Sequence, residues 1–241
     1  MTAQKASRSP DGQPVCAAGE ASPELRVLYC DKAVLVCEKP AGCLSEPGQG
    51  RNLPALAAAW LARQGEDPAV RTVHRLDKAV GGLMVLARTQ QAAASLIAQI
   101  SARTAEKEYL AVLRGEPEQP EGELTDLLFH DERTNKTFVV SRPRKGVREA
   151  KLSYRLLACR EQDGQRLSLV RVRLHTGRTH QIRVQFSSRG LPLLGDVRYG
   201  SRAAHGPALF SCLLAFDHPE TGKRMRFELK PEGTPWNLFE L

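Results

Sequence analysis

The feature that most constrains the fold is the division of the apolar residues into short, strand-like runs. Seven segments of four to nine residues are rich in aliphatic or β-branched side chains and are bounded by turn residues. They do not alternate regularly with helical repeats, as the strands of a βαβ fold would. We therefore predict an α+β protein with a mixed, mainly antiparallel sheet. The predicted strands cover residues 34–37, 83–87, 109–113, 152–157, 167–174, 208–216 and 225–229.

Three other segments show helical spacing. One helix is predicted from an apolar repeat over residues 53–61, and we expect it to end near residues 63–65. A second follows Thr89 as its N-cap, with an apolar face formed by Ala93, Leu96, Ile97 and Ile100. Residues 179–190 are ambiguous, because Ile182 and Phe186 fit both a strand and a helix. We predict a helix here with Thr179 as its N-cap. The backbone amides at the N-terminus of this helix, together with the Arg178 guanidinium, suit a phosphate.

Charge is concentrated in one part of the chain. The net charge is +8, and residues 141–190 alone hold 13 Lys and Arg against 3 Asp and Glu. Such clustering indicates a polyanionic partner, although a solvated basic face without a partner gives the same pattern. Aromatic residues make up only 5% of the chain, which argues against an aromatic platform for stacking single-stranded bases.

Domain organisation follows from composition and length. Residues 1–23 are rich in Ala, Ser, Pro, Gly and Gln and lack apolar periodicity, so we expect a flexible N-terminal tail. The remaining residues, 24–241, contain no internal repeat and are expected to form one domain.

Cysteine and histidine spacing argues against metal and disulfide sites. The six cysteines include no C-x-x-C pair, and no histidines are spaced as paired metal ligands. No apolar stretch approaches the roughly 20 residues needed to cross a bilayer. We therefore expect a cytoplasmic protein with reduced thiols, no metal and no membrane association.

The segment VHRLDKAVGG, residues 73–82, places one carboxylate, Asp77, among cationic side chains. An isolated aspartate of this kind is most often a turn former or an ion-pair partner. Neighbouring arginines also favour its ionised form, and an ionised carboxylate that faces a sugar is a competent nucleophile or proton acceptor. The segment alone leaves both interpretations open.

Three separated motifs resemble the RluA family of pseudouridine synthases. VHRLDKAVGGLMVLART resembles the HRLD signature, AEKEYLAVLRG the K-x-Y motif, and LHTGRTHQIRVQFSSRGLPLLGDVRYGS the TGRTHQIR and GD..YG signature. Their order and approximate separation match, and VLVCEKPAG resembles the opening segment of the family. The likeness extends from about residue 25 to the C-terminus and predicts the form without an S4 domain. It implies the pseudouridine synthase fold, a mainly antiparallel mixed sheet with flanking helices and loops around a central cleft.

The resemblance assigns three catalytic positions. It implies that Asp77 is the catalytic aspartate, that Tyr109 lies against the target base and that Arg183 pairs with the aspartate. Without it, Tyr109 is equally typical of a half-buried strand aromatic and Arg183 of a surface cation. Departures from the family pattern concern expected substrate contacts: Val80-Gly81-Gly82 replaces Thr-Ser-Gly, and Gln185 and Leu191 occupy positions where histidine is common.

The implied partner is ribosomal or transfer RNA, bound by a monomer without a cofactor. The target base is inaccessible in a stacked helix, so we expect the nucleotide to be flipped out at a cost of a few kcal/mol. Binding should weaken with salt. The RNA contacts are expected from His74, Arg75, Lys107, Arg171, Arg173, Arg178 and His180.

The reaction breaks the N1–C1′ bond of uridine and joins C5 to C1′ without net gain or loss of atoms, so acid–base and covalent catalysis suffice. Asp77 could attack C6, attack C1′ or remove the C2′ proton to give a glycal; the family favours the last route. Two alternatives remain. One is a catalytically inactive RNA-binding or ribosome-assembly protein of the same fold. The other is a nucleoside or glycoside hydrolase, which would need a second carboxylate such as Glu106 or Glu108.

Overall fold

The computed structural model describes residues 25–201 and 206–240, so the predicted tail at residues 1–23 lies outside the described residues. The strands are β1 (Val27–Cys30), β2 (Val34–Lys39), β3 (Arg71–Thr72), β4 (Gly81–Ala87), β5 (Glu106–Arg114), β6 (Glu121–Asp131), β7 (Lys136–Val140), β8 (Val147–Gln162), β9 (Gln165–Leu174), β10 (Leu209–Asp217) and β11 (Arg224–Glu228). The helices are α1 (Leu53–Arg63), α2 (Gln90–Ala102) and α3 (Gln181–Ser187), with short 3₁₀ turns at Val197–Tyr199 and Trp236–Leu238.

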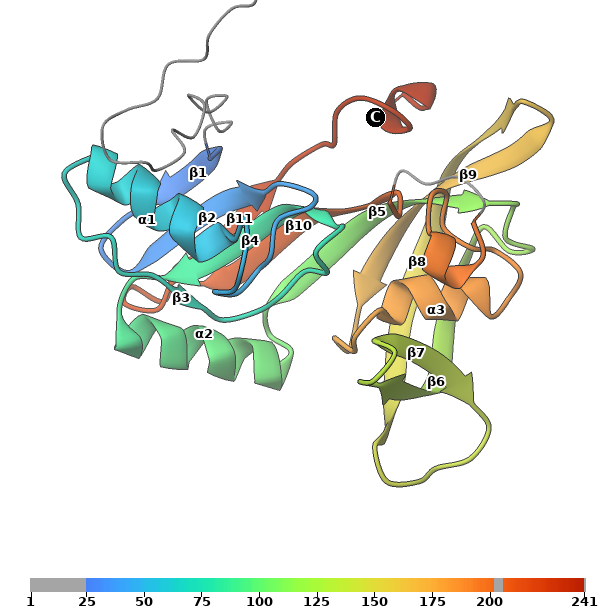
Figure 1. The fold of residues 1–241 in the computed structure, drawn as a ribbon, viewed down its shortest axis with the longest axis horizontal. Coiled ribbons are helices and arrows are strands. Elements are labelled where there is room, and N and C mark those ends of the chain that lie inside the picture. The colour runs from blue at the N-terminus through green and yellow to red at the C-terminus, as the bar shows by residue number, and fades with distance from the viewer. Residues whose placement is uncertain (1–24, 202–205, 241) are drawn as a thin grey trace, which may run out of the picture.

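The described strands form one mixed sheet in the order β1-β2-β4-β10-β5-β9-β8-β6-β7, with β11 paired to β10 and β3 to β4. All of these pairs are antiparallel except β4 with β10. Figure 1 shows α1 and α2 beside one end of the sheet and α3 beside the other, while β5 and β10 run between them. The predicted α+β class with a mainly antiparallel sheet is confirmed.

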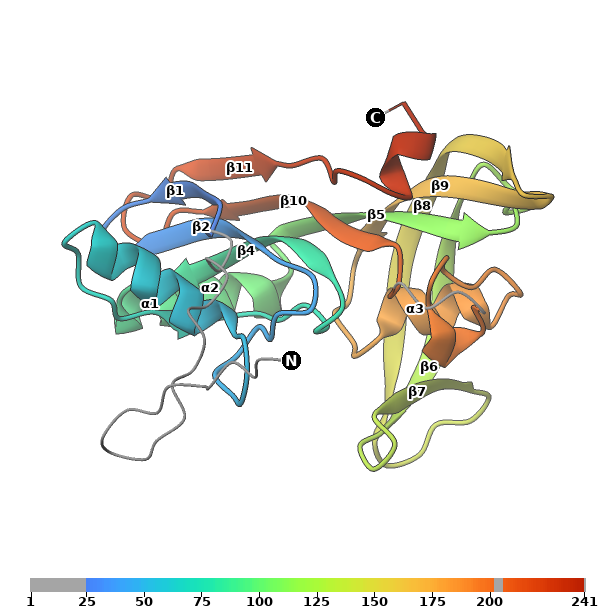
Figure 2. The ribbon, with the colours of Figure 1, turned by 45° about the horizontal axis from the view of Figure 1, so that its top comes forward.

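Strand alternation divides the core into two layers. On β4, Leu83 and Val85 pack on one side of the sheet with α2, and Met84 and Leu86 pack on the other side with α1. The second layer also contains the apolar side of α3. Figure 2 shows β11 and the C-terminal segment along the top of the sheet. The side of the sheet that carries α1 and α3 is the one that builds the site described below.

Local sequence signals explain two of the helices. Asn52 caps α1 by accepting a hydrogen bond from the Ala55 amide, and Thr89 caps α2 by accepting one from the Ala92 amide. The predicted cap at Thr89 is therefore confirmed. The predicted apolar face of α2 is partly wrong, because Ile97 is 48% exposed and the helix instead buries Ala92, Ala93 and Leu96.

The ambiguous segment near residue 180 is a helix, as predicted, but its cap is not Thr179. The cap position is His180, which adopts the left-handed conformation with φ +55° and makes no side-chain capping bond. The structure also contains four strands that we did not predict, β1, β3, β6 and β7. Of these, β6 and β7 form a hairpin at one edge of the sheet.

Candidate active site

The loop that carries Asp77 connects β3 to β4 and is fixed on both sides of the aspartate. Ser45 Oγ donates to the Leu76 carbonyl at 2.7 Å and accepts from the Leu76 amide at 2.9 Å. On the other side, the fully buried Lys39 ammonium group donates to the Lys78 carbonyl at 3.2 Å. The backbone is therefore anchored, whereas the Asp77 side chain remains 25% exposed in the wall of a cavity.

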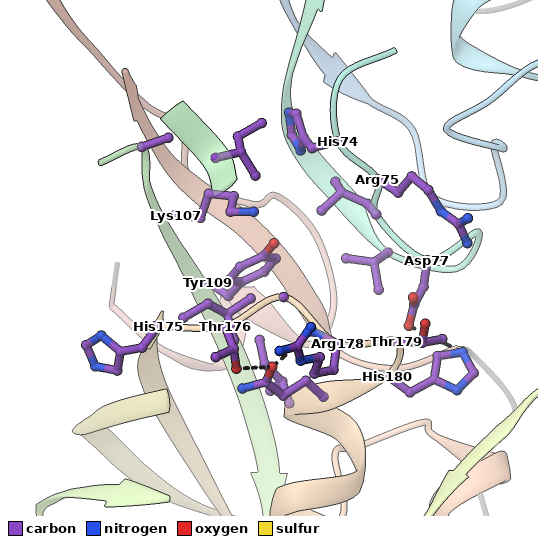
Figure 3. A pocket seen from close by; sticks show the side chains of 18 of the residues that line it. His74, Arg75, Asp77, Lys107, Tyr109, His175, Thr176, Arg178, Thr179 and His180 are labelled. Atoms are coloured by element: carbon purple, nitrogen blue, oxygen red, sulfur yellow. Dashed lines mark hydrogen bonds and ion pairs between the residues drawn. The ribbon is translucent and has the colours of Figure 1, made fainter. Parts of the chain in front are cut away.

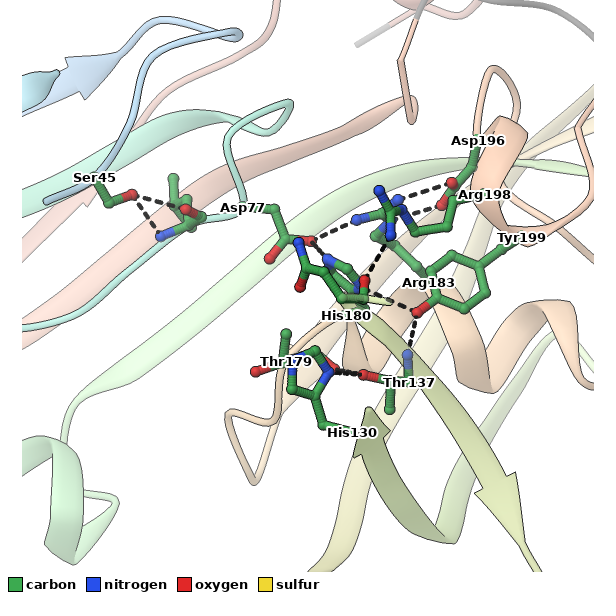
Figure 4. Close-up of polar contacts among 12 residues, drawn as sticks. Ser45, Asp77, His130, Thr137, Thr179, His180, Arg183, Asp196, Arg198 and Tyr199 are labelled. Atoms are coloured by element: carbon green, nitrogen blue, oxygen red, sulfur yellow. Dashed lines mark hydrogen bonds and ion pairs between the residues drawn. The ribbon is translucent and has the colours of Figure 1, made fainter. Parts of the chain in front are cut away.

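Helix α3 supplies the partner of this carboxylate. Its Ile182 and Phe186 pack into the core, and Arg183 extends toward the Asp77 loop. Arg183 Nη1 donates to Asp77 Oδ2 at 2.9 Å, while Nε and Nη2 donate to the two oxygens of Asp196 at 2.6 and 2.8 Å (Figure 4). Burial acts to lower the pKa of Arg183, but the two carboxylates raise it overall. The guanidinium is thus a fixed positive charge held between two acids.

Tyr109 comes from β5 and lines the same cavity as Asp77 (Figure 3). Its side chain belongs to the core layer that contains α1 and α3. Burial, and then the charge of Asp77, raise the pKa of Tyr109. The phenol is therefore protonated at neutral pH. It lines the same cavity as the Asp77 carboxylate, which is paired with Arg183. Such a pair offers a proton acceptor and a proton donor at the same place.

The cavity has a volume of about 880 Å³, within the usual range of roughly 300–1,000 Å³ for ligand pockets. Of the residues expected to contact RNA, six line it: His74, Arg75, Lys107, Arg173, Arg178 and His180. Arg75 lies at the exposed rim, where it pairs with Glu46 at 3.1 Å. Burial lowers the pKa of Lys107. The structure therefore gathers most of the expected RNA-binding residues around Asp77.

Both histidines of this group are buried. His74 Nε2 accepts a hydrogen bond from the Val85 amide at 3.1 Å, and burial, helped by the charge of Lys107, lowers its pKa to about 3. Burial likewise lowers the pKa of His180 to about 4. Both imidazoles are neutral at physiological pH. They therefore add no positive charge to the cavity.

Arg171 lies outside this cavity, which differs from our expectation for an RNA contact near the target base. Its guanidinium pairs with Glu108 at 2.6 Å and Glu228 at 2.5 Å and lines a second hollow. Arg173 borders both hollows and pairs with Glu106 at 3.5 Å. Glu106 and Glu108, the candidate second carboxylates of a hydrolase, are thus engaged by arginines of other strands.

The predicted helix-terminal phosphate site is weakened by the structure. Helix α3 has only seven residues, and the Arg178 amide already donates to Gln181 Oε1 at 3.0 Å. The Arg178 side chain lines the cavity, with Nε donating to the Glu149 carbonyl at 3.0 Å. The remaining nitrogens of this guanidinium, rather than the backbone amides, are the groups suited to a phosphate.

Asp196 is the most important site residue that sequence reasoning missed. It is almost fully buried and holds Arg183 in place. Its signal was present in LLGDVRYG, where an acidic residue follows a glycine within the resembling motif. Tyr199 in the same motif was also missed. Gln185, expected to affect substrate contacts, points away from the cavity and donates to Asp126 Oδ2 at 2.8 Å and to the Leu124 carbonyl at 3.2 Å.

Residues 25–201 and 206–240 were expected to hold neither a metal site nor a membrane-spanning helix. These residues contain no group of three or more His, Cys, Asp or Glu side chains placed to hold a metal ion. No helix in this part of the chain is both long and apolar enough to cross a membrane.

This chain is similar in sequence to known RNA pseudouridine synthases. The family model for RNA pseudouridylate synthase matches residues 33–188. The ribosomal large subunit pseudouridine synthase D of Pseudomonas aeruginosa is 34% identical over 235 residues, which cover 89% of this chain and 71% of that protein. The dual-specificity RNA pseudouridine synthase RluA of Yersinia pestis is 35% identical over 218 residues, covering 86% and 98% respectively.

A solved structure shares the fold. Human RNA pseudouridylate synthase domain containing 1 superposes with a TM-score of 0.71 at 23% identity, covering 89% of this chain and 86% of that one. This likeness supports the architecture alone. Together with the sequence relatives, the match of the family model over most of the chain shows that this protein belongs to the RluA family of RNA pseudouridine synthases.

Proposed function

We propose that this chain converts uridine to pseudouridine in ribosomal or transfer RNA, with Asp77 as the catalytic aspartate and residues 24–241 as the catalytic domain. The observation that carries the proposal is the 2.9 Å pair between Asp77 and Arg183 in the wall of the cavity that Tyr109 also lines. These three side chains come from segments far apart in the sequence. The family membership supports the reaction, and the geometry supports the assignment of its residues.

Asp77 would act on the ribose. In the route we favour, one carboxylate oxygen removes the C2′ proton as the N1–C1′ bond breaks, giving a glycal and a uracil that turns within the cavity. C5 then bonds to C1′, the proton returns to C2′, and the C5 proton is transferred to N1. Arg183 would hold the carboxylate in place, and the protonated Tyr109 would lie against the base.

The cavity suits a flipped nucleotide. Its volume of about 880 Å³ is sufficient for one nucleotide rather than a stacked helix. Arg75, Arg178 and Lys107 lie around it, and their positive charges would bind phosphates on either side of the extruded uridine. Arg75, at the rim, would contact the phosphate or occupy the vacated position in the stack.

The choice of RNA rests on the relatives. One is described as acting on the large ribosomal subunit and another as having dual specificity. From the first we infer that the substrate is a uridine in ribosomal RNA, and the resemblance to the family extends the proposal to transfer RNA. We further infer that the protein works in the cytoplasm, where ribosomal and transfer RNA are found. We also infer that it is a monomer, because one chain supplies all three proposed catalytic side chains. Light scattering in solution tests the monomer.

The decisive experiment maps pseudouridines in RNA from cells that carry the wild-type protein, no protein or Asp77→Asn. We expect the same site or sites to be lost without the protein and with Asp77→Asn. Asp163→Asn is the matched control, because Asp163 is exposed in the β8–β9 turn with φ +50°, a conformation that asparagine tolerates. This variant should retain every site.

The same experiment separates the alternatives. An inactive RNA-binding protein would leave the pseudouridine map unchanged when the gene is removed. A hydrolase would release free uracil and leave an abasic ribose instead of a new carbon–carbon bond. Either result would overturn the proposed function.

A further inference from the structure

We propose that His180 is a positioning residue for the reaction: it presents a neutral Nε2–H group to Asp77 Oδ2 and, with Arg183, leaves Oδ1 as the oxygen that reacts with the ribose. The inference rests on the proposed function of Asp77. It assigns a role to a histidine that we expected only to contact RNA.

The location of His180 suggests a role beyond packing. It immediately precedes α3 in the left-handed conformation, with φ +55°, and non-glycine residues held in this way cluster at functional sites. The ring is buried between Asp77 and Tyr199. Its Nδ1 lies 2.9 Å from Tyr199 Oη, and its Nε2 lies 3.6 Å from Asp77 Oδ2 (Figure 4).

The hydrogen bonds determine which ring nitrogen carries the proton. The Thr137 amide donates to Tyr199 Oη at 2.8 Å, and a backbone amide can only donate. The phenol proton of Tyr199 is therefore free to be donated in turn, and His180 Nδ1 is positioned to accept it. Because burial raises the pKa of Tyr199, the phenol keeps that proton. The proton of the neutral imidazole consequently lies on Nε2, the nitrogen nearest to Asp77.

The ring stays neutral because of its surroundings. Burial is the main cause of the lowered pKa of His180, about 4, and the charges of Arg183, Arg198 and His130 lower it further, while Asp77 opposes them. Tyr199 packs edge-on at 5.6 Å between ring centroids. A neutral donor orients a carboxylate without adding a second full positive charge, so it reduces the basicity of the carboxylate less than a cation would.

Among the described residues, the hydrogen bond and the ion pairs of Asp77 all fall on one carboxylate oxygen. Arg183 Nη1 and His180 Nε2 both approach Oδ2, at 2.9 and 3.6 Å. The hydrogen bonds found in the described chain include none to Oδ1 of this residue. Arg183 holds Oδ2 through a hydrogen bond and His180 Nε2 lies close to the same oxygen, so Oδ1 is the oxygen left for the ribose. The 3.6 Å separation is longer than a hydrogen bond, so a small rotation of Asp77 during reaction would complete it.

A purely structural role is the competing explanation. The same network ties the β6–β7 hairpin to α3, because Thr137 Oγ1 donates to the Thr179 carbonyl at 2.9 Å and Tyr199 contacts both Thr137 and His180. In that case, loss of the imidazole would lower stability and leave the chemical step of the folded protein intact.

Two substitutions distinguish these roles. Asparagine tolerates the left-handed backbone, and its amide reaches the position of imidazole Nδ1 but not that of Nε2. His180→Asn therefore retains the contact with Tyr199 and removes the donor near Asp77. Glutamine is one methylene longer, so His180→Gln can place an amide N–H near the position of Nε2.

The assay is single-turnover release of tritium from an RNA transcript that carries the mapped site and 5-tritiated uridine. We expect His180→Asn to slow the chemical step by about tenfold with unchanged affinity for the transcript, and His180→Gln to recover at least part of the rate. Urea unfolding of both variants reports any loss of stability separately.

The outcomes are distinguishable. A His180→Asn variant that is folded and reacts at the wild-type rate would refute the positioning role, as would rates that follow stability alone in both variants. If the wild-type protein itself releases no tritium, or if Asp77→Asn is as active as wild type, the proposed function fails instead.

Discussion

Replacing Asp196 by asparagine tests whether the charge pair behind Asp77 holds the site together. Asp196 is 1% exposed and accepts two of the three short hydrogen bonds that Arg183 makes to carboxylates. Asparagine has nearly the same shape but no charge. The substitution therefore leaves the guanidinium, itself only 8% exposed, with Asp77 as its remaining carboxylate partner in the described chain.

The size of the effect follows from burial. Breaking a buried ion pair from one side costs roughly 3–5 kcal/mol. The asparagine oxygen can still accept one hydrogen bond, which recovers about 1 kcal/mol, so we expect Asp196→Asn to lower the free energy of unfolding by about 3 kcal/mol. For a domain of this size, such a loss corresponds to a decrease in Tm of roughly 6–12 °C.

Asp77→Asn is the matched comparison, because it alters the other carboxylate of the same arginine. Its side chain is 25% exposed and accepts one hydrogen bond from Arg183, so we expect a loss of no more than about 1 kcal/mol with complete loss of pseudouridine formation. Urea unfolding and tritium release measure both variants. The reasoning is refuted if Asp196→Asn changes stability by less than 1 kcal/mol, or if Asp77→Asn is equally destabilising.

Gly82→Ala should lower the free energy of unfolding by more than about 2 kcal/mol, because φ is +117° and the new methyl group would overlap the Ser211 backbone. Gly164→Ala, with φ +70° and open space around it, should lower it by about 1 kcal/mol. Equal losses in urea unfolding would contradict the close approach of Gly82 to Ser211. Since burial lowers the pKa of His74 to about 3, the unfolded chain takes up a proton below about pH 6.5 that the folded chain excludes. His180, whose pKa burial lowers to about 4, behaves in the same way, so each of the two histidines should lower stability by about 2 kcal/mol between pH 7 and pH 5. A stability that does not change over this range would show that these histidines are not held neutral. In fluorescence anisotropy titrations with RNA, Arg178→Gln should reduce the slope of log affinity against log salt by roughly 0.7–0.9. Arg171→Gln, outside the cavity, should leave this slope unchanged. Equal slopes in the two variants would argue against a phosphate contact made by Arg178 and not by Arg171.

Much of the fold could be predicted from local patterns. Buried strands such as β4 and β10 are continuous apolar runs, and Thr89 marks the start of α2. The β6–β7 hairpin could not be recognised, because its strands lie at the sheet edge and are largely half-exposed, and β6 therefore lacks clear alternation. The cap of α3 was misassigned because His180 adopts a backbone conformation that is unusual outside glycine.

The candidate site shows the same division. Asp77, Tyr109 and Arg183 are located by motifs that carry them at recognisable positions in the sequence. Asp196 and Tyr199 act through other side chains rather than on the cavity itself. Their roles depend on distances between residues from separate elements, such as 2.9 Å from Tyr199 Oη to His180 Nδ1, and no spacing along one chain encodes such a distance.

The position of β10 has a consequence for how the protein is made. This strand lies in the sheet between β4 and β5, although it follows both of them late in the chain. During synthesis from the N-terminus, β4 and β5 leave the ribosome long before the strand that joins them. Asp77 and Tyr109 belong to segments on either side of that gap, so the proposed site cannot take its final form before β10 has been synthesised.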